Sequence, residues 1–145
     1  MAEPGRTLRY DEVEVGTELP ELAIPLTATR IIATAIASRD YQDVHHDVEL
    51  AKQRGAKGIF MNILSTNGLV GRYVSDWAGP EALFKRVNIR LGAPNYAGDT
   101  MTLRGRVKEK SVADGEGLVD VEIRGRNGLG DHVTGTVRIA LPKAR

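Results

Sequence analysis

The sequence contains no cysteine among its 145 residues. Disulfide scaffolds, thiolate zinc sites and cysteine nucleophiles are therefore excluded. Aromatic residues are also scarce, at 5% of the chain. No apolar run approaches the ~20 residues that a membrane-spanning helix needs, and the polar N-terminus lacks the apolar segment of a signal peptide. We therefore expect a cytoplasmic protein without a membrane partner.

The chain also lacks an excess of charge of one sign. Twenty basic residues face nineteen acidic ones, which gives a formal net charge of +1. Nucleic-acid and membrane-surface binders usually carry a concentrated basic excess, so neither role is expected. The length fits one domain spanning residues 1–145, with residues 1–20 as a loosely structured lead-in.

The first half of the chain predicts a strand, two short helices and a loop. Residues 21–26 form the strand, and a helix starting after Thr27 or Thr29 ends near Ser38, because its apolar residues recur at helical spacing. Residues 40–46 show no clear period and are expected to form a loop. Asp47 is a suitable N-cap for a second helix over residues 48–54, which Gly55 would end.

A longer helix is predicted over residues 62–78, followed by the stop signal Gly79-Pro80. Its apolar side chains cover much of the circumference, which is typical of a buried helix. Gly68 and Gly71 interrupt it, and each costs ~1 kcal/mol relative to alanine. We expect close approach of other backbone to explain them.

After Pro80 the pattern becomes alternating. Apolar and polar residues alternate in four runs, at residues 87–91, 102–107, 119–124 and 133–141. The segments GAPNYAGD, ADGEG and RNGLGD carry turn signals between them. These runs predict an antiparallel meander with one apolar face. Covered by the helix over residues 62–78, this sheet gives an α+β protein of the hotdog type, an antiparallel sheet wrapped around one long central helix.

Ionisable side chains gather in the segment 38–47, with Asp40 and His45 five residues apart. On an α-helix this spacing would turn the two side chains about 140° from each other, whereas an irregular loop allows them to meet. The alternative is structural: Asp40 caps a turn and His45 is a partly buried polar residue.

The same segment resembles the S-G-D-x-N-P-x-H-x-D motif of the MaoC-like hydratase family. The residues that match in register are Ser38, Asp40, His45 and Asp47, and those that depart from it are Arg39, Gln42 and Asp43. Further on, GIFMNIL resembles the family's P-I-x-H-G-M entry to the central helix, with Asn62 in place of histidine and Ile63 in place of glycine. YAGDT is similar to its P-G-D-T strand entry.

A narrower resemblance concerns the short subunit of actinobacterial heteromeric steroid side-chain enoyl-CoA hydratases. The strings that carry it are RDYQDVHHD, IFMNIL, GLVGRYVSDWAGP and RNGLGDHVT. It implies hydration of a steroid enoyl-CoA during cholesterol side-chain degradation, with Asp40 and His45 as the catalytic pair. It also implies a second MaoC-like hotdog subunit as partner, with a DUF35-type OB domain in some cases. The coenzyme A thioester is then the substrate, and no cofactor is expected.

Hydration needs a base for the water, a proton for Cα and a donor for the developing oxyanion. We expect Asp40 and His45 to orient and deprotonate the water, and one of them to return a proton; the sequence does not say which. The free N–H groups at the start of the central helix, near Asn62, Ile63 and Leu64, are the predicted substrate-binding donors.

Other polar residues receive less specific predictions. His46 stands beside His45, but without cysteines or a helical H-x3-H pair a metal site is not expected. His132 is predicted to be a solvated strand-entry residue, and Trp77 a core or interface residue. Three basic residues either line a solvated sheet face or meet the phosphates of coenzyme A: Lys85, Arg86 and Arg90.

Two other functions compete with hydration. Hotdog acyl-CoA thioesterases resemble one another in a carboxylate on or beside the central helix, whereas residues 62–75 contain none and Asp76 comes only at the far end. A non-catalytic partner subunit would not need both Asp40 and His45. In each case exposed strand edges predict an oligomer that is at least dimeric.

Overall fold

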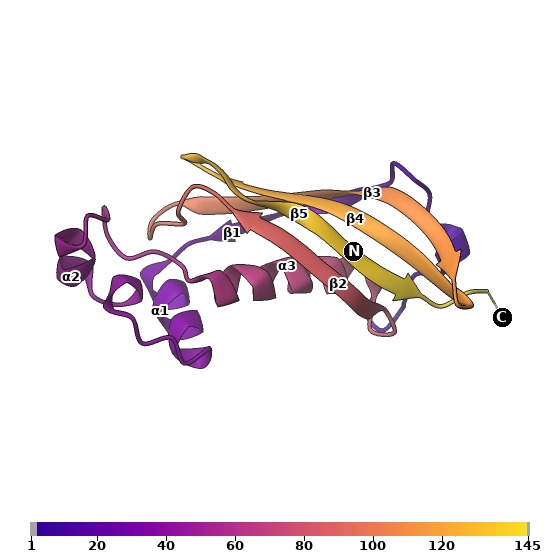
Figure 1. Cartoon of the computed structure of the whole chain (residues 1–145), viewed down its shortest axis with the longest axis horizontal. Helices are drawn as coiled ribbons and strands as arrows, with labels where there is room; N and C mark the ends of the chain where they lie inside the picture. Colours follow the sequence, from indigo (N-terminus) through magenta and orange to yellow (C-terminus); the bar gives the residue numbers. More distant parts are fainter. Residues whose placement is uncertain (1–2, 145) are drawn as a thin grey trace.

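The computed structural model describes residues 3–144. Its helices are α1 (Ala28–Ala37), α2 (Val48–Gln53) and α3 (Ile63–Ala78), and its strands are β1 (Glu18–Pro25), β2 (Leu83–Leu91), β3 (Thr100–Ala113), β4 (Glu116–Asn127) and β5 (Gly130–Leu141). The strands form one sheet that lies over α3, and α1 and α2 gather beside the start of α3 (Figure 1).

The sheet is antiparallel throughout, in the order β1-β3-β4-β5-β2. The predicted meander is therefore right only for β3, β4 and β5. Residues 92–99 were expected to form a hairpin turn, but they carry the chain from the β2 edge across to β3. The N–H groups of Gly92 and Ala93 first bond the carbonyls of His132 and Asp131, and Tyr96 then bridges to Phe60. Alternation defines the face of a strand but not its neighbour, which explains the error.

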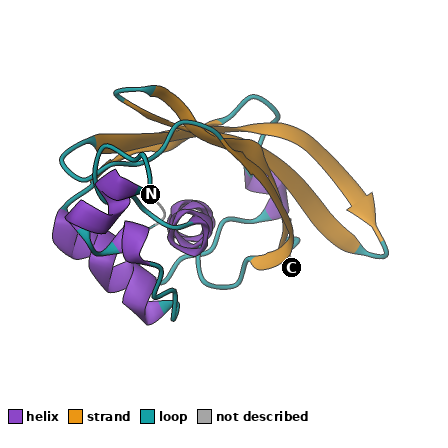
Figure 2. Cartoon of the chain, turned by 60° about the vertical axis from the view of Figure 1, so that its left-hand side comes forward, coloured by secondary structure: helices purple, strands orange, loops and turns teal. Residues whose placement is uncertain are grey.

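The core lies between the inner face of the sheet and α3. Leu103, Val121 and Val137 point inward from three adjacent strands, and Val70 and Val74 meet them from the helix; all five are fully buried. Figure 2 looks nearly along α3 and shows the sheet curving around it. This is the predicted hotdog arrangement, and it confirms the α+β class.

The predicted central helix is confirmed, with Asn62 as its N-cap and Gly79 as its C-cap. Gly79 has φ +97°, and a side chain there would collide with the backbone of Arg6 and Thr7. Gly68 and Gly71 do not have the close backbone neighbours that were predicted for them. A Cβ at either position would meet nothing within 4 Å in residues 3–144, so no backbone of this chain approaches them. One side of α3 is left uncovered by its own protomer.

The lead-in contains one short 3-10 helix, Tyr10–Glu12, before β1 starts at Glu18. It is nevertheless packed against the domain. Thr7 and Val13 are buried, and the N–H of Leu8 donates to the carbonyl of Ala78 at 2.8 Å. Residues 1 and 2 of the lead-in lie outside the described part. Within residues 3–144, no helix has the length and apolar character needed to cross a membrane.

Candidate active site

Asp40 is positioned by the way α1 ends. The N–H of Asp40 bonds the carbonyl of Ala35 and the N–H of Arg39 bonds that of Ile36, each at 2.9 Å. Arg39 itself has φ 56°, in the left-handed region. These bonds form a Schellman motif, in which the chain turns sharply away from the helix axis. Asp40 is the first residue after that turn, and its backbone is therefore fixed.

His45 is positioned by a 3-10 helix, Asp43–His45, inside the segment predicted as a loop. Its Nδ1 lies 2.7 Å from the carbonyl oxygen of Phe60, and its ring packs edge-on against the Phe60 ring with centroids 5.1 Å apart. Arg54 at the end of α2 reaches back to the Asp43 carboxylate at 2.8 Å. The His45 ring is buried, at 6% exposure, and has one fixed orientation.

The loop brings the predicted catalytic pair together. Asp40 Oδ2 and His45 Nε2 lie 3.4 Å apart, and the Asp40 carboxylate is the more exposed of the two groups. Because His45 Nδ1 faces a carbonyl, the hydrogen of the neutral ring sits on Nδ1 and Nε2 is an acceptor. The Asp40 carboxylate and His45 Nε2 are then both hydrogen-bond acceptors, and neither can donate to the other. One water molecule that gives a hydrogen to each satisfies both groups.

The charge of Asp40 is stabilised locally. Asn62 Nδ2 donates to Asp40 Oδ2 at 3.0 Å, and the N–H of Gln42 donates to Oδ1 at 3.3 Å. The Asn62 bond is the main reason that the pKa of Asp40 is lowered from its usual value; partial burial opposes it, while Gln42 and the nearby His45 add to it. Asp40 is therefore a carboxylate at neutral pH.

The three residues predicted to bind substrate lie at the start of α3 and differ in what they can offer a ligand. The side chain of Asn62 is buried and bonded within the protein, so it is not available to a ligand. The backbone N–H groups of Ile63 and Leu64 belong to the first helical turn, which has no intrahelical acceptors. The side chains of Ile63 and Leu64 are exposed, at 57% and 52%. The predicted oxyanion donors are thus reduced to two backbone groups, and their role stays a prediction.

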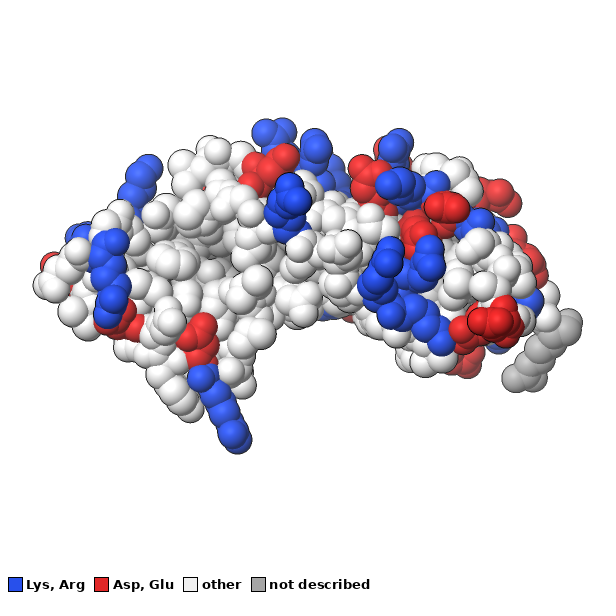
Figure 3. All heavy atoms as spheres, viewed as in Figure 1, with Lys and Arg blue, Asp and Glu red and all other residues white. Residues whose placement is uncertain are grey.

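The segments that carry and flank the pair expose several large apolar side chains. Six large apolar side chains are exposed between residues 36 and 64: Ile36, Tyr41, Val48, Leu50, Ile63 and Leu64. A pocket of about 390 Å³, which neither Asp40 nor His45 lines, opens between the start of α1, the start of α2, Ile59 and Tyr96, with Lys57 on its wall. In Figure 3 charged side chains crowd over the sheet, whereas the area around the start of α3 carries few.

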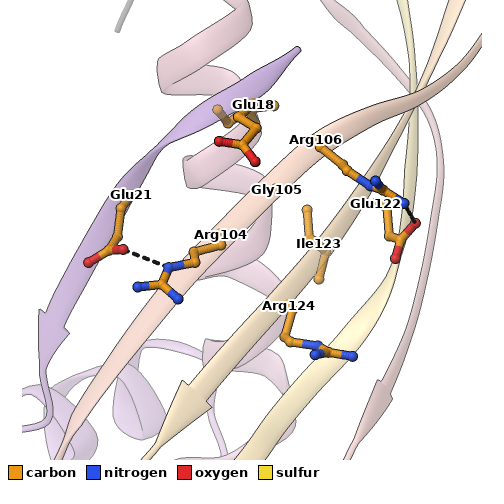
Figure 4. A pocket seen from close by; sticks show the side chains of 9 residues that line it. Glu18, Glu21, Arg104, Gly105, Arg106, Glu122, Ile123 and Arg124 are labelled. Atoms are coloured by element: carbon orange, nitrogen blue, oxygen red, sulfur yellow. Dashed lines mark hydrogen bonds and ion pairs between the residues drawn. The ribbon is translucent and has the colours of Figure 1, made fainter. Parts of the chain in front are cut away.

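A second hollow, of about 420 Å³, lies away from the pair between β1, β3 and β4. Charged side chains frame it, and the ion pairs Arg104–Glu21 and Arg106–Glu122 cross it (Figure 4). Because its charges largely neutralise one another, this hollow fits a solvated sheet face and not an acyl group.

His132 contradicts its prediction as a solvated residue. It is buried at 3% exposure, with Nδ1 donating to the carbonyl of Ala93 at 2.7 Å and Nε2 accepting from Thr66 Oγ1 at 2.8 Å. The first residues after β2 and the second turn of α3 cover it. Burial lowers the pKa of its imidazole, so the ring is held neutral.

The other predicted residues are not members of the Asp40–His45 pair. Lys85 pairs with Glu116 at 2.7 Å, and Arg86 and Arg90 are exposed on β2. Trp77 is part of the core, as one of its two predictions had it. His46 is exposed, and residues 3–144 contain no group of three or more His, Cys, Asp or Glu side chains placed to hold a metal ion.

The acidic residue of α3 is Asp76, and its surroundings do not favour a thioesterase site. Asp76 pairs with Arg72 one turn away, at 3.3 Å, and both side chains are exposed. Since α3 is about 24 Å long, Asp76 stands near the end opposite to Asp40 and His45.

The chain is similar in sequence and structure to known proteins. The MaoC-like domain model matches residues 12–126. The chain belongs to the MaoC-like domain family. One MaoC-like relative, the beta subunit of 3-oxo-4,17-pregnadiene-20-carboxyl-CoA hydratase from Mycobacterium tuberculosis, is 53% identical over 127 residues, which are 88% of this chain and 95% of the relative.

Solved structures agree with this assignment. A chain of the ChsH1–ChsH2 complex from Mycobacterium tuberculosis superposes with a TM-score of 0.82 at 53% identity, covering 88% of this chain and 98% of that one. The R-hydratase PhaJ1 from Pseudomonas aeruginosa superposes with a TM-score of 0.85 over 95% of this chain and 88% of its own, at 23% identity. The second similarity shows the shared MaoC-like hotdog fold.

Proposed function

We propose that this chain is the catalytic subunit of a heteromeric hydratase that adds water across the 2,3 double bond of a steroid side-chain enoyl-CoA. The observation that carries the proposal is the Asp40–His45 pair, whose Oδ2 and Nε2 atoms lie 3.4 Å apart and both accept hydrogen bonds. The relative that is 53% identical, a steroid carboxyl-CoA hydratase subunit, supports the same reaction.

The chemistry follows from the two acceptors. A water held by Asp40 and His45 loses one proton to the pair while its oxygen forms a bond to C3. The electrons of the double bond move onto the thioester carbonyl, whose developing charge faces the N–H groups of Ile63 and Leu64. The pair then returns the proton to C2, so that one water is added and nothing is oxidised or reduced. Each proton transfer contributes roughly 10²–10⁴ in rate, and no cofactor is needed beyond the coenzyme A of the substrate.

The steroid acyl group is supported by the surface around the pair. A rigid hydrocarbon ring system needs apolar contacts, and α1, α2 and the start of α3 each expose large apolar side chains. A coenzyme A thioester as substrate also implies a cytoplasmic location.

The partner we propose is a second MaoC-like hotdog subunit, placed along β2 and the uncovered side of α3. β2 is an edge strand, and four of its large apolar side chains are exposed: Leu83, Phe84, Val87 and Leu91. Exposed apolar edges of this kind are normally covered. Gly68 and Gly71 leave open space on α3, which lets a neighbouring backbone come close.

Loss of enoyl-thioester absorbance with a steroid enoyl-CoA tests the proposal, with the chain assayed alone and with a second MaoC-like subunit. Activity only in the mixture, abolished by Asp40→Ala, is the expected result. Activity of the chain alone on short straight-chain enoyl-CoAs would indicate a general homomeric hydratase. Release of free thiol would indicate a thioesterase. Full activity of an assembled complex that carries both Asp40→Ala and His45→Ala would make this subunit non-catalytic.

A further inference from the structure

We infer that Asn62 is the positioning residue of the catalytic carboxylate: its side-chain amide joins Asp40 to the start of α3 and fixes which way Oδ2 faces. This inference rests on the proposed function, because it assigns a role within the same site. Asn62 does not touch the substrate in this role. It acts through Asp40.

Every hydrogen-bonding position of the Asn62 side-chain amide has a partner within the protein. Its Nδ2 has two hydrogens, which go to Asp40 Oδ2 and to Ser38 Oγ, each at 3.0 Å. Its Oδ1 has two lone pairs, which accept the backbone N–H of Ser65 at 3.0 Å and the Ser65 hydroxyl. An asparagine side chain can make four hydrogen bonds of this kind, and Asn62 makes all four.

The partners of the Asn62 side-chain amide fix which end is the oxygen and which is the NH2 group. The carbonyl of Asn62 faces the Ser65 N–H, which can only donate, and its NH2 group faces the Asp40 carboxylate, which can only accept. A flipped amide would place two donors together at Ser65 and two acceptors together at Asp40. The Ser38 hydroxyl agrees with this direction, since it bonds the carbonyls of Thr34 and Ala35 as a donor and keeps its lone pairs for Asn62.

The Asn62 side chain is also buried. Asn62 is 2% exposed, so its bond to Asp40 is not weakened by competing water. The same bond is the largest cause of the lowered pKa of Asp40. A buried amide that caps a helix with one end and holds a carboxylate with the other ties the geometry of the pair to the rigid central helix.

Asn62→Asp separates the positioning role from helix capping. Aspartate is as good an N-cap as asparagine, so the bond to the Ser65 N–H is kept. The NH2 donor is lost, and a second carboxylate faces Asp40. We expect kcat to fall roughly 10²-fold with KM nearly unchanged, because a displaced Asp40 carboxylate no longer orients the water toward the substrate. The acid limb of the pH–rate profile should move to higher pH, and carbon NMR of the Asp40 carboxyl should show a higher pKa than in the unchanged protein.

Thr27→Asp is the matched control, because it places the same charge at the N-cap of α1, where it caps equally well and does not contact Asp40. This variant should keep the kcat and the pH–rate profile of the unchanged protein. The inference fails if Asn62→Asp, folded to the same melting temperature, also keeps both while Asp40→Ala is inactive. If Asp40→Ala itself retains full activity, the proposed site is wrong and the failure lies there.

Discussion

His45 is anchored on the backbone of Phe60, with Nδ1 2.7 Å from the carbonyl oxygen, and this contact sets which nitrogen faces Asp40. A carbonyl cannot donate, so in the neutral ring the hydrogen sits on Nδ1 and Nε2 faces Asp40 as an acceptor. The backbone thus selects the tautomer without a second carboxylate behind the imidazole. The consequences for activity and stability can be tested one residue at a time.

The first prediction concerns His45. His45→Ala removes one of the two groups that hold and deprotonate the water, and we expect kcat/KM for hydration to fall roughly 10²–10⁴-fold. Loss of absorbance of the enoyl thioester measures it. His46→Ala is the control, since this exposed neighbour does not face the Asp40 carboxylate and should leave the rate unchanged. Equal losses in both variants would contradict the role given to His45.

The second prediction concerns the strained residue before the catalytic carboxylate. Arg39 has φ 56°, a conformation that costs a non-glycine residue roughly 1–2 kcal/mol. Arg39→Gly should raise the free energy of unfolding by about 1 kcal/mol, after allowance for the more flexible unfolded chain. Arg39→Ala, which loses the same side chain but keeps Cβ, should show no such gain. Urea unfolding of both variants decides the matter, and a more stable Arg39→Ala would disprove the strain.

The third prediction concerns His132, whose pKa is lowered by burial. The unfolded chain then binds a proton more readily than the folded one. Stability is complete above the unfolded value of ~6.5 and falls as the pH drops from there toward the folded pKa. His132→Gln should lose about 1–3 kcal/mol at neutral pH through its hydrogen bonds, and should respond less to acid than the unchanged protein. Urea unfolding at several pH values measures both effects, and an equally steep acid response in His132→Gln would exclude this group as its source.

The fourth prediction concerns the uncovered side of α3. Gly68→Ala should stabilise the isolated chain by about 1 kcal/mol, because alanine is the better helix former and the position has open space. Gly68→Leu should also fold, yet it should block the second hotdog subunit if that subunit approaches α3 closely. Size-exclusion chromatography of the mixture compares the two variants. A stable complex with Gly68→Leu would place the interface elsewhere.

The sequence predicted the features that depend on neighbouring residues. Thr27 and Asp47 were expected as possible caps, and each accepts the N–H three residues further on. The central helix and its end at Gly79 were also predicted, because apolar periodicity and stop signals are local. The meeting of Asp40 and His45 was suggested by a motif, and the Schellman turn and the 3-10 helix that bring it about became visible only in three dimensions.

Features that depend on distant segments were missed. The pairing of β2 with β5 cannot be read from alternation, since any two strands of the same pattern could pair. His132 owes its burial to Thr66, which precedes it by 66 residues, and to the backbone of Ala93. The hold of Asn62 on Asp40 spans 22 residues. The local signals for Asn62 were its place at the start of a helix and its position in the GIFMNIL motif, and neither indicates a bond to Asp40.

The proposed catalytic pair is held mainly by backbone groups and one buried side chain, not by exposed side chains. In hydrogen bonds to the pair, Gln42 contributes its N–H to Asp40, Phe60 contributes its carbonyl to His45, and Asn62 contributes its side-chain amide. The exposed side chains of Tyr41 and Val48 take no part in these bonds. The surface proposed to meet the acyl group can therefore change in evolution while the atoms proposed to activate the water stay in place. In such a protein, substrate range and reaction type are free to diverge independently.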